Sequence, residues 1–228
     1  GHDADSWGTE FRGVREAELT AALGEKMTAL LAKDKELEVI LLRDSKGYNP
    51  AFLDYFASRQ DAIRAFAKKQ KTATKDVVAS GQLRTLPDGI VHNTASSDVA
   101  LKLYGVNKWA NDSGINLVIH VHFNDYPGRR AGRPGKYSGF SIYVPEIQFS
   151  NAKASQAVAE ELFRQMAKYY PISNLPKEEA GAIEDQDLIA IGANNSLDAA
   201  GVLIEYGYIY EPMFANDSIR DKVLGDLA

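Results

Sequence analysis

Histidine is rare in this chain, and its few histidines are the first candidates for chemistry: His2, His92, His120 and His122. His120 and His122 stand two apart in the apolar segment VIHVH. Residues two apart on a β-strand point to the same face, so both imidazoles are expected on one side of a sheet. A pair of this kind can bind a metal ion or move protons. A single strand histidine is more often a core residue satisfied by one hydrogen bond.

A carboxylate closes a second apolar segment. Glu205 ends the run GVLIE, and a buried carboxylate without a partner is costly, so either an ion pair or a chemical role is expected for it. The chain has no cysteine, which excludes disulfides and thiolate metal sites. Any metal site must therefore use histidine and carboxylate ligands.

The segments around these residues predict strands that alternate with helices. Helices are expected at about 16–33, 50–69, 97–112, 152–169 and 217–227, and strands at 38–42, 116–123, 139–144, 200–205 and around 189–191. Strands separated by helices need crossover connections, so we predict a single α/β domain with a largely parallel, mixed twisted sheet and helices on both faces. Ligands of such sheets bind at the carboxyl ends of strands, where His122 and Glu205 stand.

Composition narrows the classes of function. The 228 residues suit one domain, and a net charge of −5 argues against a broadly basic surface for nucleic acid. No apolar run approaches the ~20 residues that span a membrane, and no signal peptide is visible. The chain begins with Gly1 instead of methionine, so we expect it to be a processed or trimmed piece.

Residues 70–98 are polar and contain Gly81, Pro87 and Gly89. We interpret them as an insertion with little regular structure that adds little to the core and acts as a lid, a regulatory segment or a docking site. His92 lies inside it and is expected at the surface.

Four segments, taken in order, resemble motifs of the zinc-dependent N-acetylmuramoyl-L-alanine amidases of the type 3 family. That family has a Gly-His followed by a glycine-rich loop and a helix-starting Glu, then strands ending in Thr-Arg and in Ser-Ile-His-Ala-Asn, and finally Val-Glu-X-Gly-Phe. The similar segments here are Gly1-His2 with Gly8, Gly13 and Glu16; Leu42-Arg43-Asp44; His120 to Asn124; and Ile204 to Tyr208. The order and rough spacing agree over nearly the whole chain.

The resemblance implies a site and a reaction. It makes His2, Glu16 and His122 the ligands of a Zn²⁺ ion and Glu205 the catalytic acid–base. Three protein ligands leave one zinc position open for water, and a carboxylate that is not bound to the metal can take the water's proton. The implied reaction is hydrolysis of the amide between N-acetylmuramic acid and L-alanine in peptidoglycan. The implied substrate is the polymer or its muropeptides, and the implied location is outside the cytoplasm. A protein activator is a possible partner.

Three further residues take roles from the same resemblance. Asn124 follows His122 by two residues, as in the family, and this selects His122 over His120 as the ligand. His120 stands where the family usually has a small serine. We expect His120, Asn124 and Arg43 to support the ligands or to contact substrate. The family also has an apolar strand running into its Gly-His, and that strand is missing upstream of Gly1.

Alternatives remain for each part of the site. Glu16 could be an acid that the helix dipole favours in a first turn, and Glu205 a structural ion-pair partner. Gly1-His2 could be the scar of a purification tag. The chain as a whole could be a catalytically silent wall-binding or regulatory module on the same fold. A short basic segment is either a solvated loop or a patch for an anionic wall polymer: Arg129, Arg130, Arg133 and Lys136.

Overall fold

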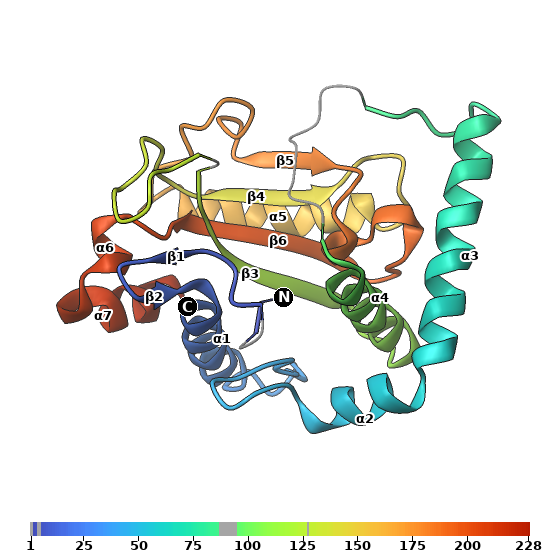
Figure 1. Ribbon diagram of the computed structural model, residues 1–228, viewed down its shortest axis with the longest axis horizontal. Helices are drawn as coiled ribbons and strands as arrows, with labels where there is room; N and C mark the ends of the chain where they lie inside the picture. Colours follow the sequence, from blue (N-terminus) through green and yellow to red (C-terminus); the bar gives the residue numbers. More distant parts are fainter. Residues whose placement is uncertain (1, 4–5, 87–94, 127) are drawn as a thin grey trace.

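The computed structural model describes residues 2–3, 6–86, 95–126 and 128–228, and it is built on a four-stranded sheet (Figure 1). The strands, in spatial order, are β3 (Leu117–Asn124), β6 (Ala200–Tyr208), β4 (Ser141–Pro145) and β5 (Ala182–Asp185). β3 pairs with β6 and β4 with β5 in parallel, whereas β4 and β6 are antiparallel. The predicted α/β class and mixed sheet are therefore confirmed.

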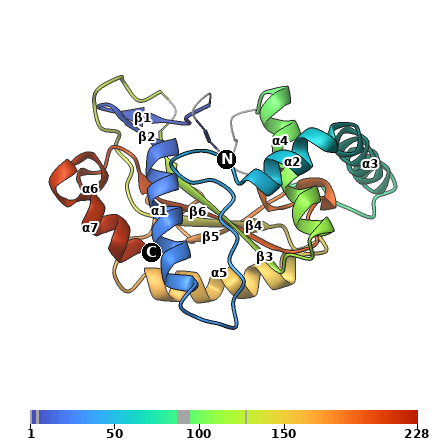
Figure 2. The ribbon, with the colours of Figure 1, turned by 90° about the horizontal axis from the view of Figure 1, so that it is seen from below.

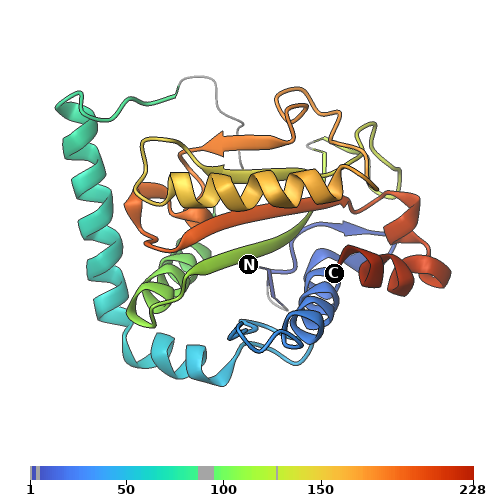
Figure 3. The same ribbon diagram turned by 180° about the vertical axis from the view of Figure 1, so that it is seen from behind.

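Helices lie on both sides of this sheet. Their bounds are α1 (Glu16–Leu31), α2 (Pro50–Ser58), α3 (Gln60–Ala79), α4 (Ser97–Asp112), α5 (Ala152–Met166), α6 (Pro212–Ala215) and α7 (Asp217–Leu227). Figure 2 shows α5 on one side of the sheet and α4 with α2 on the other, and Figure 3 shows α5 running along the strands. None of the described helices is long and apolar enough to cross a membrane.

The two faces of the sheet differ in chemistry. Ile142, Val202 and Ile204 are buried in the main core, which includes the inner side of α5. The alternate residues Tyr143 and Leu203 belong to a second cluster, formed with the short 3₁₀ turn η1 (Ile189–Ile191). A second 3₁₀ turn, η2 (Ala193–Asn195), follows η1 in the chain. Because side chains alternate along a strand, the positions two before and two after Leu203 share this second face. Glu205 is one of them.

The strand predicted at 38–42 is absent. Leu37 and Ile40 are 48% and 40% exposed, and the segment pairs with no strand of the described chain. Its apolar residues made it a strand candidate, but a strand also needs a neighbour to satisfy its backbone groups. Here the only ladder-like contact is the isolated bridge between Arg43 and Tyr48.

The region around the predicted insertion also differs from expectation. The helix expected to end near residue 69 is two helices, and the second, α3, continues to Ala79. Leu83 is 8% exposed and packs with Phe149 and Ala152, so this part of the segment does contribute to a core. Residues 87–94, which include His92, lie outside the described residues. The strand expected around 189–191 is the 3₁₀ turn η1 instead.

Candidate metal centre

Three side chains from distant segments meet beside the end of β3. His2 comes from the N-terminal segment, Glu16 is the first residue of α1, and His122 lies near the end of β3. Nε2 of His2 is 3.3 Å from Oε2 of Glu16, and Nδ1 of His122 is 2.9 Å from Oε1 of Glu16. One candidate ligand atom from each residue lies within 4.8 Å of the other two, as a shared metal ion requires.

The backbone holds Glu16 in this position. The amide of Thr9 donates to Oε2 at 3.1 Å, and the amide of Phe123 donates to Oε1 at 3.2 Å. A turn at Gly8, with φ of +77°, brings the chain against Glu16 and His2. A side chain at Gly8 would collide with both residues, so both the conformation and the close approach require glycine.

The charge states of the cluster suit a cation. Burial opposes ionisation of Glu16, yet the hydrogen bond from His122 and the charges of both histidines lower the pKa of this carboxyl overall. Burial lowers the pKa of His2 and outweighs the attraction of Glu16. A carboxylate and a neutral imidazole are the forms that bind metals.

A second set of contacts fixes the N-terminal segment. Asp3, which directly follows His2, accepts hydrogen bonds from Nζ of Lys102 at 2.6 Å and from the hydroxyl of Tyr48 at 3.0 Å. The amide of Ser6 donates to the same carboxylate at 2.9 Å. Lys102 lies on α4, so this contact ties Asp3 to a helix.

We therefore expect Lys102→Met to weaken metal binding by about tenfold, as changes to groups that orient metal ligands commonly do. The substitution removes one of the contacts that hold Asp3, so the neighbouring His2 is held less firmly. Lys108→Met is the matched control, because Lys108 pairs with Asp112 at 3.0 Å on the same helix without touching the cluster. Competition with a chelator measures both affinities. Equal affinities in the two variants would show that Asp3 does not position His2.

Glu205 lies in the row of the sheet that contains His122. The pairing register places Glu205 opposite His122 of β3 on one side and Ser141 of β4 on the other. Glu205 is partly accessible as a residue, but its Oε2 atom is buried and has no hydrogen-bond partner in the described part of the chain. Burial, with the charges of Glu16 and Glu178 nearby, raises the pKa of Glu205. A raised pKa makes this carboxyl a stronger proton acceptor than an exposed glutamate, which is the property that an acid–base group needs.

Glu178 forms the centre of a buried polar network next to Glu205. This carboxylate is 1% exposed and accepts hydrogen bonds from the hydroxyls of Tyr143 and Ser173. Asn124 also donates to it, at 3.2 Å. These donors hold the Glu178 carboxylate in place, and its charge contributes to the raised pKa of Glu205.

The basic segment is only partly a solvated loop. Arg129 binds Asp125 through two nitrogens and donates to the carbonyl of Glu10 at 2.8 Å. Asp125 in turn accepts from the hydroxyl of Thr9, whose amide holds Glu16. Arg129 therefore fastens the loop after β3 to β1 (Glu10–Phe11), which pairs with β2 (Val14–Arg15) just before Glu16.

The remaining predicted residues lie around the cluster without joining it. His120 is 8% exposed and lies on the same face of β3 as His122, two residues before it. Burial lowers the pKa of His120 to about 3. Arg43 donates to the carbonyl of Ala17 at 2.7 Å and to Thr20, so it braces the first turn of α1. Sequence reasoning missed Asp3, Lys102 and Glu178, because contacts such as Lys102 with Asp3 and Tyr143 with Glu178 join residues far apart in the sequence.

Comparisons with known proteins identify the family and the fold. The sequence model of a family described as N-acetylmuramoyl-L-alanine amidase matches residues 86–217, which include His122 and Glu205 but not His2 or Glu16. No curated protein sequence matches significantly.

Two solved structures share the fold. The catalytic domain of CwlV, an N-acetylmuramoyl-L-alanine amidase from Bacillus (Paenibacillus) polymyxa var. colistinus, is similar with a TM-score of 0.52 and 16% identity, over 99% of this chain and 92% of that one. Cwp6 from Clostridium difficile has a TM-score of 0.53 and 14% identity, over 100% of this chain and 26% of that one.

Proposed function

Since this chain belongs to the N-acetylmuramoyl-L-alanine amidase family, we propose that it hydrolyses the amide between the lactyl group of N-acetylmuramic acid and L-alanine of the stem peptide. The observation that carries the proposal is the convergence of His2, Glu16 and His122 beside Glu205. His2 and Glu16 lie outside the range of the family match, so the support for them is their proximity to His122. The substrate, peptidoglycan, is a polymer of the cell wall, and we place the activity outside the cytoplasm.

We infer that the metal is Zn²⁺ and that His2, Glu16 and His122 hold it. One candidate ligand atom from each of these residues lies within 4.8 Å of the other two, which is close enough for all three to hold one ion. Two imidazoles and one carboxylate, without cysteine, form a donor set typical of catalytic zinc. When bound, the ion lowers the pKa of water and polarises the substrate carbonyl.

Metal binding and proton transfer are assigned to different residues of the chain. Glu16 and the imidazoles of His2 and His122 would offer lone pairs to the ion, and the amides of Thr9 and Phe123 hold the Glu16 carboxylate in place. We propose that Glu205 takes the proton of the attacking water and gives it to the leaving amine of L-alanine. The unpartnered Oε2 atom of Glu205 supports this role, because a structural ion pair would occupy it.

Metal analysis combined with product analysis tests the proposal. We expect one zinc per chain, and purified peptidoglycan should yield peptides with a free L-alanine amino terminus. His2→Ala should lose the metal, whereas the scar of a purification tag would leave metal content unchanged. A catalytically silent module would release no peptide. Cleavage within the glycan or within the stem peptide would contradict the assigned bond.

A further inference from the structure

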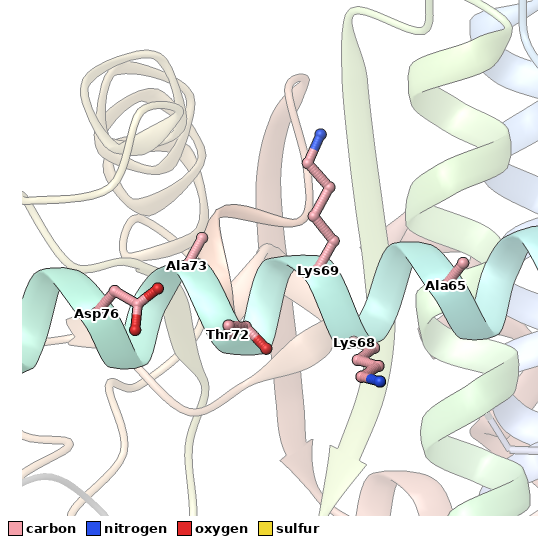
Figure 4. A pocket seen from close by; sticks show the side chains of 6 residues that line it. All are labelled: Ala65, Lys68, Lys69, Thr72, Ala73 and Asp76. Atoms are coloured by element: carbon pink, nitrogen blue, oxygen red, sulfur yellow. The ribbon is translucent and has the colours of Figure 1, made fainter.

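A basic groove lies between α3 and α4, away from the metal centre. It has a volume of about 420 Å³ and is formed by side chains of both helices: Arg64, Ala67, Lys68, Lys71, Thr72 and Lys75 from α3, with Ser97, Ala100, Leu101 and Tyr104 from α4. Figure 1 shows α3 as a long helix at the edge of the molecule, and Figure 4 shows Lys68 and Lys69 pointing to opposite sides of it. Lys69 is not among the residues that line the basic groove.

Four cations line this groove at helical spacing. Arg64, Lys68, Lys71 and Lys75 follow one another at intervals of four, three and four residues, so they share one face of α3 and span about 16 Å at 1.5 Å per residue. Within the described part of the chain, none of them has a carboxylate oxygen within 4.0 Å. The chain carries a net charge of −5, which makes a stripe of unpaired positive charge unexpected.

Packing of the helix does not explain these charges. The inner side of α3 buries Ile63 and Ala67 against Tyr104, and Gln70 donates to the carbonyl of Asn195 at 3.0 Å. These contacts fix α3 without help from the cations, all of which are exposed. Nζ of Lys71 lies 5.2 Å from the centroid of the Tyr104 ring, which is buried beneath the groove.

The groove lies one helix away from the candidate metal centre. α4 contributes Leu101 and Tyr104 to the groove, while the adjacent Lys102 reaches Asp3 next to His2. Figure 2 shows α4 between the N-terminal segment and α3. A helix with its side chains is about 10–12 Å wide, so a polymer bound at the metal centre can also reach the groove.

We propose that the basic groove binds free carboxylates of stem peptides on the same peptidoglycan polymer whose amide is cut at the metal centre, an inference that rests on the proposed function. Stem peptides carry carboxylates, and a chain of net negative charge would otherwise repel them. Three of the four cations are lysines. A lysine is a point charge on a flexible side chain, so it can follow the carboxylates of a flexible peptide, whereas the rigid guanidinium of arginine suits a ligand of fixed geometry. The groove holds the polymer while the metal centre acts on one amide.

Kinetics on two substrates test the groove. Lys68→Glu/Lys71→Glu should raise KM by about tenfold on peptidoglycan stripped of phosphate polymers, with kcat unchanged, because the groove binds without taking part in chemistry. On a muropeptide with a single stem, the same variant should match the wild type. Lys33→Glu/Lys69→Glu is the control: it changes net charge equally and touches no groove residue, so both KM values should stay unchanged.

Amidation of the polymer's carboxylates provides a second arm. Amidation removes the negative charges, so the wild type should have the same raised KM on amidated polymer as the groove variant has on untreated polymer. Added salt screens the charges and should raise the KM of the wild type on untreated polymer. An unchanged KM of the groove variant on polymer would overturn the proposal, as would equal impairment on the single-stem muropeptide. If wild type cleaves neither substrate, the proposed function fails. Sedimentation with intact peptidoglycan then still tests the groove, because only the groove variant should lose binding.

Discussion

Glu205→Gln should lower the rate of peptide release by at least about a hundredfold while zinc content stays at the wild-type level. Glutamine has nearly the same shape as glutamate but cannot accept the proton of the attacking water. Glu205 lies opposite His122 in the sheet, yet it is not one of the residues whose ligand atoms converge, so its replacement should spare the metal. Metal analysis and muropeptide release on one purified variant measure both quantities.

The melting temperature of the metal-free protein provides the control for this variant. Burial raises the pKa of Glu205 in the folded state above its ordinary value of 4.5, so the wild type loses stability as pH rises past 4.5 towards the folded pKa. Glutamine carries no such penalty. The variant should therefore melt a few degrees higher than wild type at neutral pH, and the difference should vanish below about pH 4.5.

Other outcomes assign Glu205 a different role. Loss of zinc together with activity would make it a ligand. Retained activity with a lower melting temperature would make it a structural ion-pair partner and would remove it from the mechanism.

The strands that carry chemistry could be predicted because each is a short apolar run that ends in a polar residue. β3 and β6 begin with runs of this kind, and His122 lies near the end of β3 as expected, whereas β6 continues past Glu205 to Tyr208. The order of motifs further indicated that His2 and Glu16 belong with them. The contacts that support the site could not be predicted. Glu178 gathers donors from three other segments, and nothing in its own neighbourhood of the sequence indicates that it is buried.

The errors in the sequence analysis also have physical causes. Residues 38–42 have the composition of a buried strand, but composition does not show whether a neighbouring strand is present. The polar stretch after residue 69 looked irregular because one side of α3 consists of lysines and threonines. Only a narrow side of α3 faces the rest of the protein, and it contains Ile63, Ala67 and Gln70. A solvated or ligand-binding helix of this kind shows only a thin apolar stripe.

His122→Ala should lower zinc affinity by about a thousandfold, whereas His120→Ala should leave the zinc in place. The two histidines share a face of β3, so sequence alone separates them only through Asn124. The structure distinguishes them by geometry: Nδ1 of His122 is 2.9 Å from Glu16, while His120 is buried one row back beside η1. Removing one of three ligands forfeits roughly a third of the binding free energy, which accounts for the large expected loss.

The His120 variant supplies the comparison. Its replacement leaves a cavity behind the site, so we expect a lower melting temperature and a partial loss of activity with full zinc occupancy. Titration of both variants with zinc against a chelator, at matched protein concentration, gives the two affinities directly. If His120→Ala loses the metal and His122→Ala retains it, the cluster of His2, Glu16 and His122 is not the binding site. Both histidines are held on the same strand, so a local movement of a loop cannot bring His120 into the position of His122.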